Sequence, residues 1–431
     1  MLEENIINIL KEEIIPAEGC TEPVAIAYVA AKATEILGTV PDKLKIYVSG
    51  NMIKNVKSVI IPNSGGMVGI EVAAVMGALF GNPEKDLLVI NHITKENMND
   101  VRAFLLNNIV ETIHIKNSIK LYIKIEAFYK TDSAIVEVKH LHTNITKIEK
   151  NGQKLVQRTC NDHDFYSPYT DREQLSIQRI YNLAKTIDIK KIQPIFKKVV
   201  EYNCKIANEG LNEVYGVNIG SIILKNIEEG IYGNELKNKC ASFASAGSDA
   251  RMSGCSLPVM TTSGSGNQGM AASLPVIKYC QEKKLSEEQL YRALFFSHLA
   301  TIHIKTKVGR LSAYCGVICA CSAVAGAIAF IEKYPYEIVA DSITNSLGCI
   351  SGVICDGAKA SCAMKIANGV YSAFDSSMLA MNKKVLESGD GIIGADVEET
   401  IKNIGILSQE GMKETDEVIL EIMGNCYKEP K

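Results

Sequence analysis

Hydrophobic and polar positions follow different spacings in successive stretches of the chain. Residues 43–49 alternate between polar and apolar side chains, which predicts a β-strand. Residues 69–80 are apolar nearly all round, as expected of a helix packed in a core, and residues 24–37 are also predicted to be helical. Residues 1–80 are therefore predicted to fold as helix, short strand and helix.

A strand-rich stretch follows between about residues 85 and 156. Residues 87–92 are predicted to form a strand and residues 95–108 a helix. Four further runs have the composition of strands, namely residues 111–116, 120–128, 134–140 and 144–149. Asn151 and Gly152 then form a typical turn sequence. This stretch is predicted to be an α+β module with a mostly antiparallel sheet.

The remainder of the chain has a helical pattern. Residues 161–171 form a polar linker without apolar periodicity, and long segments rich in Ala, Ile and Leu follow almost to the end. The predicted fold class is α+β. Residues 1–80 and 172–431 are assigned to a large all-helical domain, and residues 81–171 to a smaller α+β domain and linker.

One uncharged stretch is long enough to raise the question of a membrane span. Residues 311–331 carry no charged side chain and match the roughly 20 residues that cross a bilayer. The stretch is rich in Gly, Ala, Ser and Cys rather than Leu, and it lacks a clear aromatic belt. It is predicted to be a buried helix, and no membrane partner is expected.

Composition indicates which kinds of binding partner and which cellular compartment to expect. The 431 residues carry a net charge of -3 and contain no Trp, which argues against a nucleic-acid partner. Thirteen cysteines is an odd number without regular spacing, which favours a reducing compartment over a disulfide framework. The amino terminus has neither a basic region nor a continuous apolar segment, so no export signal is expected. A cytoplasmic location is predicted, and self-association into a homo-oligomer is left open.

A glycine-rich loop at residues 263–269 is the first candidate for chemistry. It contains the G-x-G-x-x-G pattern, but Pro258 interrupts the approach where a dinucleotide site needs a hydrophobic strand. Backbone amides and polar side chains just before a predicted helix suit a carboxylate or phosphate instead. The residues assigned to this anion cradle are Ser263, Ser265, Gly266, Asn267 and Gln268. An ordinary glycine-rich connector is the alternative.

Cysteines are concentrated in one region of the carboxyl-terminal half. They are Cys315, Cys319, Cys321, Cys349, Cys355 and Cys362. None forms a C-x-x-C pair and no His lies among them, which argues against a zinc ribbon. Cys355 and Cys362 flank a polar loop rather than an apolar face, so their thiolates could hold a soft metal centre. Inert cysteines buried in a core are the alternative.

Another cysteine lies in a turn near the amino terminus. Cys20 precedes the predicted helix 24–37, whose amino terminus lowers the pKa of the thiol, whereas Glu18 and Glu22 raise it. The expected result is a thiol that can act as a base near neutral pH. A structural helix cap is the alternative.

A second polar turn lies at residues 49–55. It offers the amides of Asn51 and Asn55 and the charge of Lys54, which suit a carboxylate. A plain cluster of turn residues is the alternative.

Taken together, these stretches resemble the L-cysteine desulfidase family, whose helical domain is similar to the iron-sulfur L-serine dehydratases. The resemblance spans nearly the whole chain. The motifs that carry it are Glu18 to Pro23, Gly50-Asn51, Lys54-Asn55, Gly247 to Met252, Ser263 to Gly269, Cys315-Gly316, Cys355 to Lys359 with Cys362, Gly411-Met412 and Thr415-Asp416.

The resemblance implies a [4Fe-4S] cluster held by Cys315, Cys355 and Cys362, with the fourth iron open to an amino-acid substrate. Cys319 and Cys321 are extra thiols that could compete with Cys315 as ligands. Elimination of hydrogen sulfide from L-cysteine, giving pyruvate and ammonia, is the implied reaction. The resemblance thus implies an oxygen-sensitive lyase of cysteine catabolism whose catalytic domain is the helical one.

For proton transfer, the resemblance implies that Cys20 lies near the substrate. Its thiol is then the candidate for the base that removes the α-proton, the most demanding step without an electron sink.

Three alternatives remain open. The first keeps the cluster but takes L-serine, with water as the leaving group. The second is a pyridoxal-phosphate lyase in which residues 263–269 hold the phosphate and Lys54, Lys305 or Lys359 forms the Schiff base. The third is a membrane or scaffolding protein whose core thiols are inert.

Overall fold

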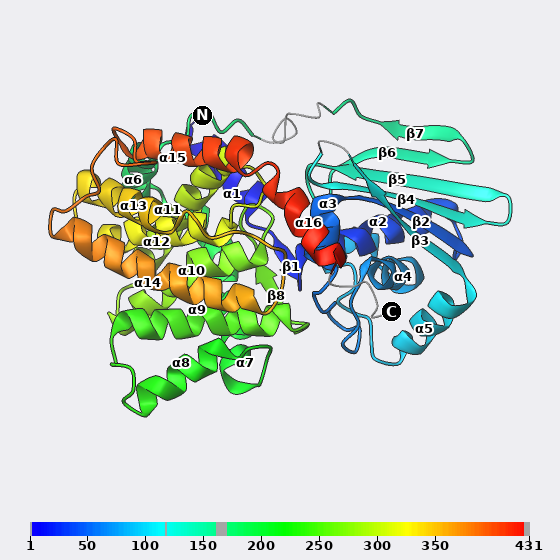
Figure 1. The fold of residues 1–431 in the computed structure, drawn as a ribbon, viewed down its shortest axis with the longest axis horizontal. Coiled ribbons are helices and arrows are strands. Elements are labelled where there is room, and N and C mark those ends of the chain that lie inside the picture. Colours follow the sequence, from blue (N-terminus) through cyan, green and yellow to red (C-terminus); the bar gives the residue numbers. More distant parts are fainter. Residues whose placement is uncertain (1, 117–118, 161–169, 426–431) are drawn as a thin grey trace.

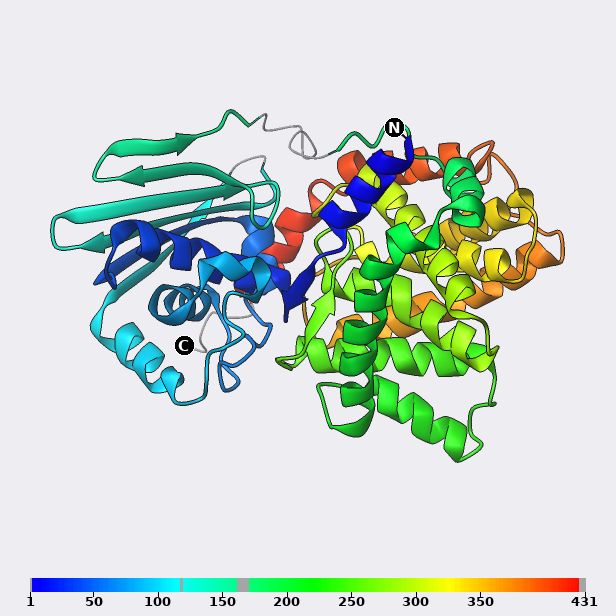
Figure 2. The same cartoon turned by 180° about the vertical axis from the view of Figure 1, so that it is seen from behind.

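Two halves lie side by side in the computed structural model, which describes residues 2–116, 119–160 and 170–425. Helices fill one half, and a sheet with covering helices forms the other (Figure 1). Each half has its own core: the core of the helical half runs from Ile6 to Ile14 and from Leu175 to Ile404, and that of the sheet half from Ala17 to Ile148. Seen from behind, helix α1 (Leu2–Glu13) lies against the helical half (Figure 2).

The sheet half is built on a six-stranded sheet in the order β3-β2-β4-β5-β6-β7. The pair β2 (Lys43–Ser49) and β3 (Ile109–Ile115) is parallel, and the other neighbouring pairs are antiparallel. The remaining strands are β4 (Tyr122–Tyr129), β5 (Asp132–Lys139), β6 (Ile145–Lys150) and β7 (Gln153–Gln157). Side chains along β4 alternate between buried and half-buried positions, so one face of the sheet packs on the core.

Helices cover that face of the sheet. They are α2 (Thr21–Leu37), α3 (Gly50–Val56), α4 (Ile70–Phe80), the 3₁₀-helix η1 (Pro83–Leu88) and α5 (Asn97–Asn107). Helix α2 packs on β4 and β5, and α4 packs on α2. A Cβ at Gly77 would lie 2.1 Å from the carbonyl oxygen of Ala27, so this crossing requires glycine.

The helical half is an assembly of long helices. Its helices besides α1 are α6 (Ile177–Thr186), α7 (Ile189–Asn212), α8 (Ile219–Glu228), α9 (Leu236–Met252), α10 (Gly266–Glu282), α11 (Glu287–Val308), α12 (Gly316–Ile331), α13 (Tyr336–Ile350), α14 (Ser361–Met381) and α15 (Val397–Ile406). Helix α12 is surrounded by α10, α11, α13 and α14, which confirms the predicted buried helix. Among the described residues, no helix is both long enough and apolar enough to cross a bilayer.

Two elements join the halves. Strand β1 (Pro16–Glu18) pairs antiparallel with β8 (Pro258–Met260), so the chain passes from the helical half into α2. Helix α16 (Thr415–Asn425) follows the π-helical turn η2 (Leu407–Gly411) and packs on α3, between the two halves (Figure 1). Segments from both ends of the chain therefore meet at the junction.

The observed elements agree with most of the predicted ones, and the α+β fold class is confirmed. The strand predicted at residues 87–92 is wrong, because Pro83–Leu88 form a 3₁₀-helix and residues 89–92, all described, contain no strand. Leu87, Val89 and Ile90 are buried. Their apolar character therefore reflects burial rather than pairing in a sheet.

The cores divide the chain at a different place from the predicted domains. Residues 1–80 were assigned to the helical domain, but the core of the sheet half begins at Ala17 and β2 is an interior strand of the sheet. Parallel pairing of β2 with β3 joins residues that are far apart in sequence, and no local pattern reports such a contact. Of the predicted linker, residues 161–169 lie outside the described residues.

Glu18 of β1 is fully buried at the junction. Its Oε1 accepts a hydrogen bond from Asn63 Nδ2 at 2.7 Å, whereas its Oε2 has no partner among the described residues. Burial raises the pKa of Glu18 to about 8, against the opposing effects of Asn63 and Lys85. The folded protein therefore holds this proton more tightly than the unfolded chain does.

A pH-dependent stability follows from Glu18. The free energy of unfolding should fall between pH 4.5 and about pH 8, because the unfolded carboxyl ionises first. The slope from this group approaches about 1.4 kcal/mol per pH unit. Glu18→Gln keeps an acceptor for Asn63 and should flatten this part of the profile in urea unfolding, whereas the exposed control Glu201→Gln should follow the wild type. Parallel profiles for Glu18→Gln and the wild type would contradict the prediction.

Candidate functional site

One cavity at the junction of the halves gathers most of the predicted site residues. It has a volume of about 90 Å³ and is lined from both halves. The predicted residues that line it are Cys20, Asn51, Lys54, Asn55, Ser265, Asn267, Gln268, Cys315, Cys355 and Cys362. Ser263 and Gly266 belong to the same glycine-rich loop but do not line the cavity.

Cys20 is the N-cap residue of α2 and is only 2% exposed. Its thiol donates a hydrogen bond to Glu22 Oε2 at 3.0 Å. Burial raises the pKa of the thiol well above its ordinary value, and the charge of Glu22 raises it further against the charge of Arg251. The prediction that the Cys20 thiol alone acts as a base near neutral pH is therefore wrong. The helix amino terminus does not offset the rise in pKa that burial causes.

Glu22 links Cys20 to the sheet half. Its Oε1 accepts a hydrogen bond from Asn55 Nδ2 at 3.1 Å and lies 3.8 Å from His142 Nε2. Burial alone would raise the pKa of Glu22, but His142, the Cys20 thiol and Arg251 together lower it to about 2. A protonated thiol therefore faces an ionised carboxylate.

Cys315, Cys355 and Cys362 approach the cavity from three segments of the helical half. Cys315 is the N-cap residue of α12, and Cys362 lies in the first turn of α14. Backbone hydrogen bonds from Cys315 to Val353 (3.2 Å) and from Cys355 to Ala313 (2.6 Å) hold two of these segments together. Burial raises the pKa of Cys315 to about 12, with further contributions from Cys355 and Cys362. The three sulfurs therefore lie close enough to influence one another.

Lys54 of the sheet half fixes the loop that carries Cys355. Its Nζ donates a hydrogen bond to the Cys355 carbonyl oxygen at 3.0 Å and forms an ion pair with Asp416 of α16. Gly357 in this loop has a φ of 102°, and a Cβ there would lie 2.3 Å from the Lys54 carbonyl oxygen, so only glycine fits. Because Asp416 already neutralises its charge, Lys54 is poorly suited to the substrate carboxylate for which it was predicted.

The neighbouring thiols belong to the core. Cys319 and Cys321 are fully buried in the helical half and do not line the cavity. Across residues 2–116, 119–160 and 170–425, no group of three or more His, Cys, Asp or Glu side chains is arranged to hold a single metal ion. Thiolates that each bind a different iron of a cluster stand farther apart than the ligands of one ion.

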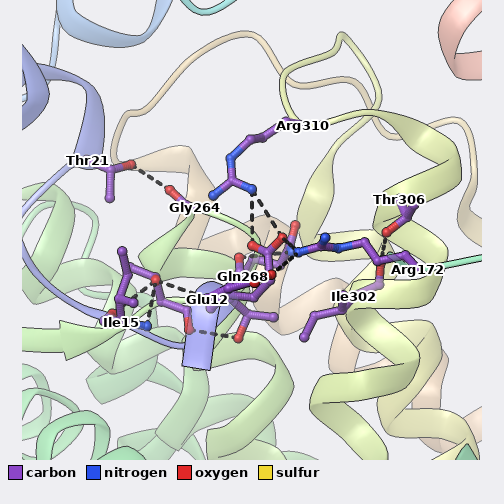
Figure 3. A network of polar contacts seen from close by, with 12 residues as sticks. Glu12, Ile15, Thr21, Arg172, Gly264, Gln268, Ile302, Thr306 and Arg310 are labelled. Atoms are coloured by element: carbon purple, nitrogen blue, oxygen red, sulfur yellow. Dashed lines mark hydrogen bonds and ion pairs between the residues drawn. The ribbon is translucent and has the colours of Figure 1, made fainter. Parts of the chain in front are cut away.

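The glycine-rich loop opens helix α10, as predicted. Ser265 is the N-cap residue of α10, and its hydroxyl accepts a hydrogen bond from the backbone N–H of Gln268 at 3.3 Å. Gln268 Nε2 in turn donates to the Thr262 carbonyl oxygen at 3.1 Å. Thr21 of α2 donates its hydroxyl to the Gly264 carbonyl oxygen at 2.9 Å, which ties the loop to the sheet half (Figure 3).

A buried ion network supports the same loop. Arg310, which lines the cavity, pairs with Glu13 at 3.1 Å, and Arg172 pairs with both Glu13 and Glu12. Figure 3 shows the guanidinium groups of Arg310 and Arg172 converging on one cluster of carboxylate oxygens. A Cβ at Gly264 would lie 2.8 Å from Arg310 Nη2, so the loop rests directly on this network.

No site role was predicted for three charged residues that line the cavity, namely Glu22, Arg251 and Arg310, and Lys305 was named only as a Schiff-base alternative. Glu22 and Arg251 stand in motifs that carry the family resemblance, so a signal for them existed. Lys305 and Arg310 stand shortly before Cys315 in a stretch that is otherwise largely buried. Charges in such a stretch are rare without a partner or a function.

The three lysines considered for a Schiff base differ in their surroundings. Lys359 does not line the cavity and pairs with Asp356 at 3.0 Å, and Lys54 is paired with Asp416. Lys305 lines the cavity at 4% exposure, and its side chain has no hydrogen bond or ion pair with any described residue. Burial lowers the pKa of Lys305, against the raising effect of nearby thiols.

Several polar atoms of the cavity-lining side chains have no partner among the described residues. They are Asn51 Nδ2, Asn55 Oδ1, Gln268 Oε1 and Arg251 Nε. Leaving buried polar groups unpaired is costly, so such groups indicate a ligand that completes them. Unpaired amides next to three thiols fit a polar substrate beside a cofactor held by thiolates.

Comparisons with known proteins agree on one family. Residues 84–421 match the family described as serine dehydratase alpha chain. A UPF0597 protein of Fusobacterium nucleatum is 62% identical over 420 residues, which cover 97% of this chain and 98% of the relative. UPF0597 proteins of Treponema denticola and Desulfitobacterium hafniense are 43% and 44% identical, covering 97% and 98% of this chain and 97% of each relative. With helices α6 to α15 and the three cavity cysteines of the helical half inside the match, the chain belongs to the serine dehydratase alpha chain family, a family of lyase-type enzymes.

Proposed function

We propose that the protein is an iron-sulfur L-cysteine desulfidase, which releases hydrogen sulfide from L-cysteine. One observation carries this proposal: Cys20 from the sheet half lines the same cavity as Cys315, Cys355 and Cys362 from the helical half. A thiol hydrogen-bonded to a carboxylate suits proton transfer, and three thiols around one space suit a soft metal centre.

In this proposal Cys315, Cys355 and Cys362 hold a [4Fe-4S] cluster. The iron without a protein ligand would supply Lewis acidity toward the carboxylate or sulfur of the substrate. Cys315 stands at the amino terminus of α12, where the helix dipole favours a thiolate. The ammonium group of Lys305 lies near Cys355 and Cys315 and offsets their negative charge as thiolates. The chain thus supplies both the donor atoms and the compensating charge.

Cys20 and Glu22 act as a pair in removing the α-proton. The thiol is protonated at rest, and its proton lies on the 3.0 Å hydrogen bond to Glu22. As the sulfur accepts the proton from the substrate Cα, its own proton passes to Glu22 Oε2. The sulfur remains neutral throughout, and the carboxylate ends protonated. Asn55 holds Glu22 in position for this transfer.

The same pair returns a proton to the leaving group. Cleavage of the Cβ–S bond of the substrate releases hydrosulfide and leaves 2-aminoacrylate. Hydrosulfide takes the proton stored on Glu22 and leaves as hydrogen sulfide. The 2-aminoacrylate then tautomerises and hydrolyses to pyruvate and ammonia, so the pair is restored for the next turnover.

Anaerobic reconstitution tests the proposal. Protein supplied with iron and sulfide in the absence of oxygen should bind about four irons per chain and show a broad visible absorbance. It should release sulfide and pyruvate from L-cysteine in equal amounts, and both absorbance and activity should decline in air. Fully loaded protein that releases no sulfide from L-cysteine would refute the proposal.

L-serine dehydratase is the second candidate, and the description of the matching family favours it. It would use the same thiols and the same proton pair, with water as the leaving group. The values of kcat/KM for L-cysteine and L-serine on one anaerobic preparation separate the two candidates. A larger value for L-serine would replace the desulfidase by the dehydratase.

A further inference from the structure

Four buried cations line the cavity in the described part of the chain, and two of them have an anionic partner there. Lys54 pairs with Asp416, and Arg310 pairs with a carboxylate of α1. The side chains of Arg251 and Lys305 form no hydrogen bond or ion pair with any described residue. Arg251 is only 2% exposed. A buried cation without a partner is costly, so it indicates an anion that comes from outside the chain.

Arg251 lies against the first turn of α10. A Cβ at Gly266 would lie 2.4 Å from Arg251 Nε, so the guanidinium group occupies the space that a side chain would fill. Gly266 and Asn267 are the first two residues of this 17-residue helix, where backbone N–H groups have no partner within the helix. The positive end of the helix dipole thus adds to the charge of Arg251. Two independent features offer donors to the same anion.

Arg251 is also the unpaired cation near Cys20. Its charge opposes the rise in the pKa of Cys20 and Cys362 and helps to lower the pKa of Glu22. The charge of Lys305 instead interacts with the thiols of Cys319, Cys355 and Cys315. The carboxylate carbon of an α-amino acid is bonded directly to Cα. A carboxylate anchor for proton removal by Cys20 must therefore lie close to Cys20, and Arg251 is the unpaired cation whose charge acts on both Cys20 and Glu22.

We propose that Arg251 and the amino terminus of α10 bind the α-carboxylate of the substrate. This inference rests on the proposed elimination from a small amino acid and names the group that selects for a carboxylate. The planar guanidinium group binds a carboxylate through two parallel N–H···O bonds, and the backbone N–H of Asn267, which lines the cavity, adds a further donor. The same anchor serves L-cysteine and L-serine, so it sets the substrate class rather than the leaving group.

Binding of L-alanine and L-alaninamide to the reconstituted holoenzyme tests this site. Neither probe can eliminate, and they differ only in the carboxylate. Calorimetry on the wild type should show L-alanine binding at least about 30-fold more tightly than the amide. Arg251→Gln should abolish that preference and raise KM for the substrate about 100-fold, with a smaller effect on kcat. Iron content and thermal unfolding show whether the variant is folded and loaded.

Two further variants separate the geometry of the site from its charge. Arg251→Lys keeps the positive charge but loses the planar guanidinium group that donates two parallel hydrogen bonds. It should therefore retain only part of the preference for a carboxylate. Gly266→Ala keeps every charge but places a Cβ where the guanidinium group of Arg251 lies. It should weaken the binding of L-alanine more than the binding of L-alaninamide. The exposed control Arg179→Gln should match the wild type in both measurements.

Each outcome separates the two proposals. Folded Arg251→Gln or Gly266→Ala protein that still prefers L-alanine as strongly as the wild type would overturn the carboxylate site. A wild-type holoenzyme that prefers L-alanine but eliminates nothing from L-cysteine or L-serine would overturn the proposed function and support the site. If Arg251→Gln does not fold, Gly266→Ala and Arg251→Lys decide the question by the same measurement.

Discussion

Replacing Cys355 by alanine should remove the iron centre and the activity together. Cys355 is held by its backbone, through the hydrogen bond from Lys54 to its carbonyl oxygen, so the substitution removes the thiol without releasing the loop. A cluster that loses one of three protein ligands is expected to dissociate. Iron and acid-labile sulfide should fall more than about tenfold, and sulfide release from L-cysteine below about 1% of the wild type.

Cys349→Ala is the matched control for this experiment. Cys349 is an exposed cysteine of α13 that does not line the cavity. Its substitution should leave iron content, absorbance and sulfide release at the wild-type level. Retention of iron and activity in Cys355→Ala would remove Cys355 from the ligand set. If Cys319→Ala loses iron and Cys315→Ala retains it, Cys319 rather than Cys315 is the third ligand.

Replacing Cys20 by alanine should lower kcat about 1000-fold without loss of iron. The α-proton would have no acceptor, whereas the three cysteines of the helical half would remain. Glu22→Gln should lower kcat about 100-fold, because the Cys20 thiol would have no carboxylate to take its proton. Both variants should keep the visible absorbance of the wild type, which separates proton transfer from cluster binding.

Deuterium exchange at the substrate Cα measures the same step directly. L-cysteine recovered from a reaction in D₂O should carry deuterium at Cα with the wild type and not with Cys20→Ala. Cys204→Ala, which changes a half-buried thiol of α7 away from the cavity, should exchange as the wild type does. Exchange at the wild-type rate in Cys20→Ala would show that another group removes the proton.

Local patterns predicted the secondary structure where one periodicity dominated. The alternation in residues 43–49 predicted β2 with its observed bounds, and the apolar pattern of residues 69–80 predicted α4 within one residue. Residues 87–92 misled the prediction because a short buried run has no periodicity of its own. The place of β2 in the sheet was out of reach, since it depends on pairing with the distant strand β3.

The sequence predicted which residues line the site better than it predicted their charge states and ion pairs. Ten predicted residues line the cavity. Polar turns indicated those in residues 51–55 and 265–268, whereas the set of Cys315, Cys355 and Cys362 was implied by the family resemblance. The pairing of Lys54 with Asp416, and the raised pKa of Cys20, depend on contacts and burial that appear only when the halves meet. Arg251 was overlooked as a ligand group because its lack of a partner is a property of the fold, not of its motif.

The reacting groups are divided across the contact between the halves. Cys20 and Glu22 stand on one lobe and the three neighbouring cysteines on the other, so neither lobe produced alone would carry both the proton acceptor and the sulfur ligands. Lys54 connects the two lobes through its ion pair with Asp416 and its hydrogen bond to the Cys355 carbonyl oxygen. A slight hinge opening would separate the two sets of groups without unfolding either lobe, and turnover would stop with both lobes intact.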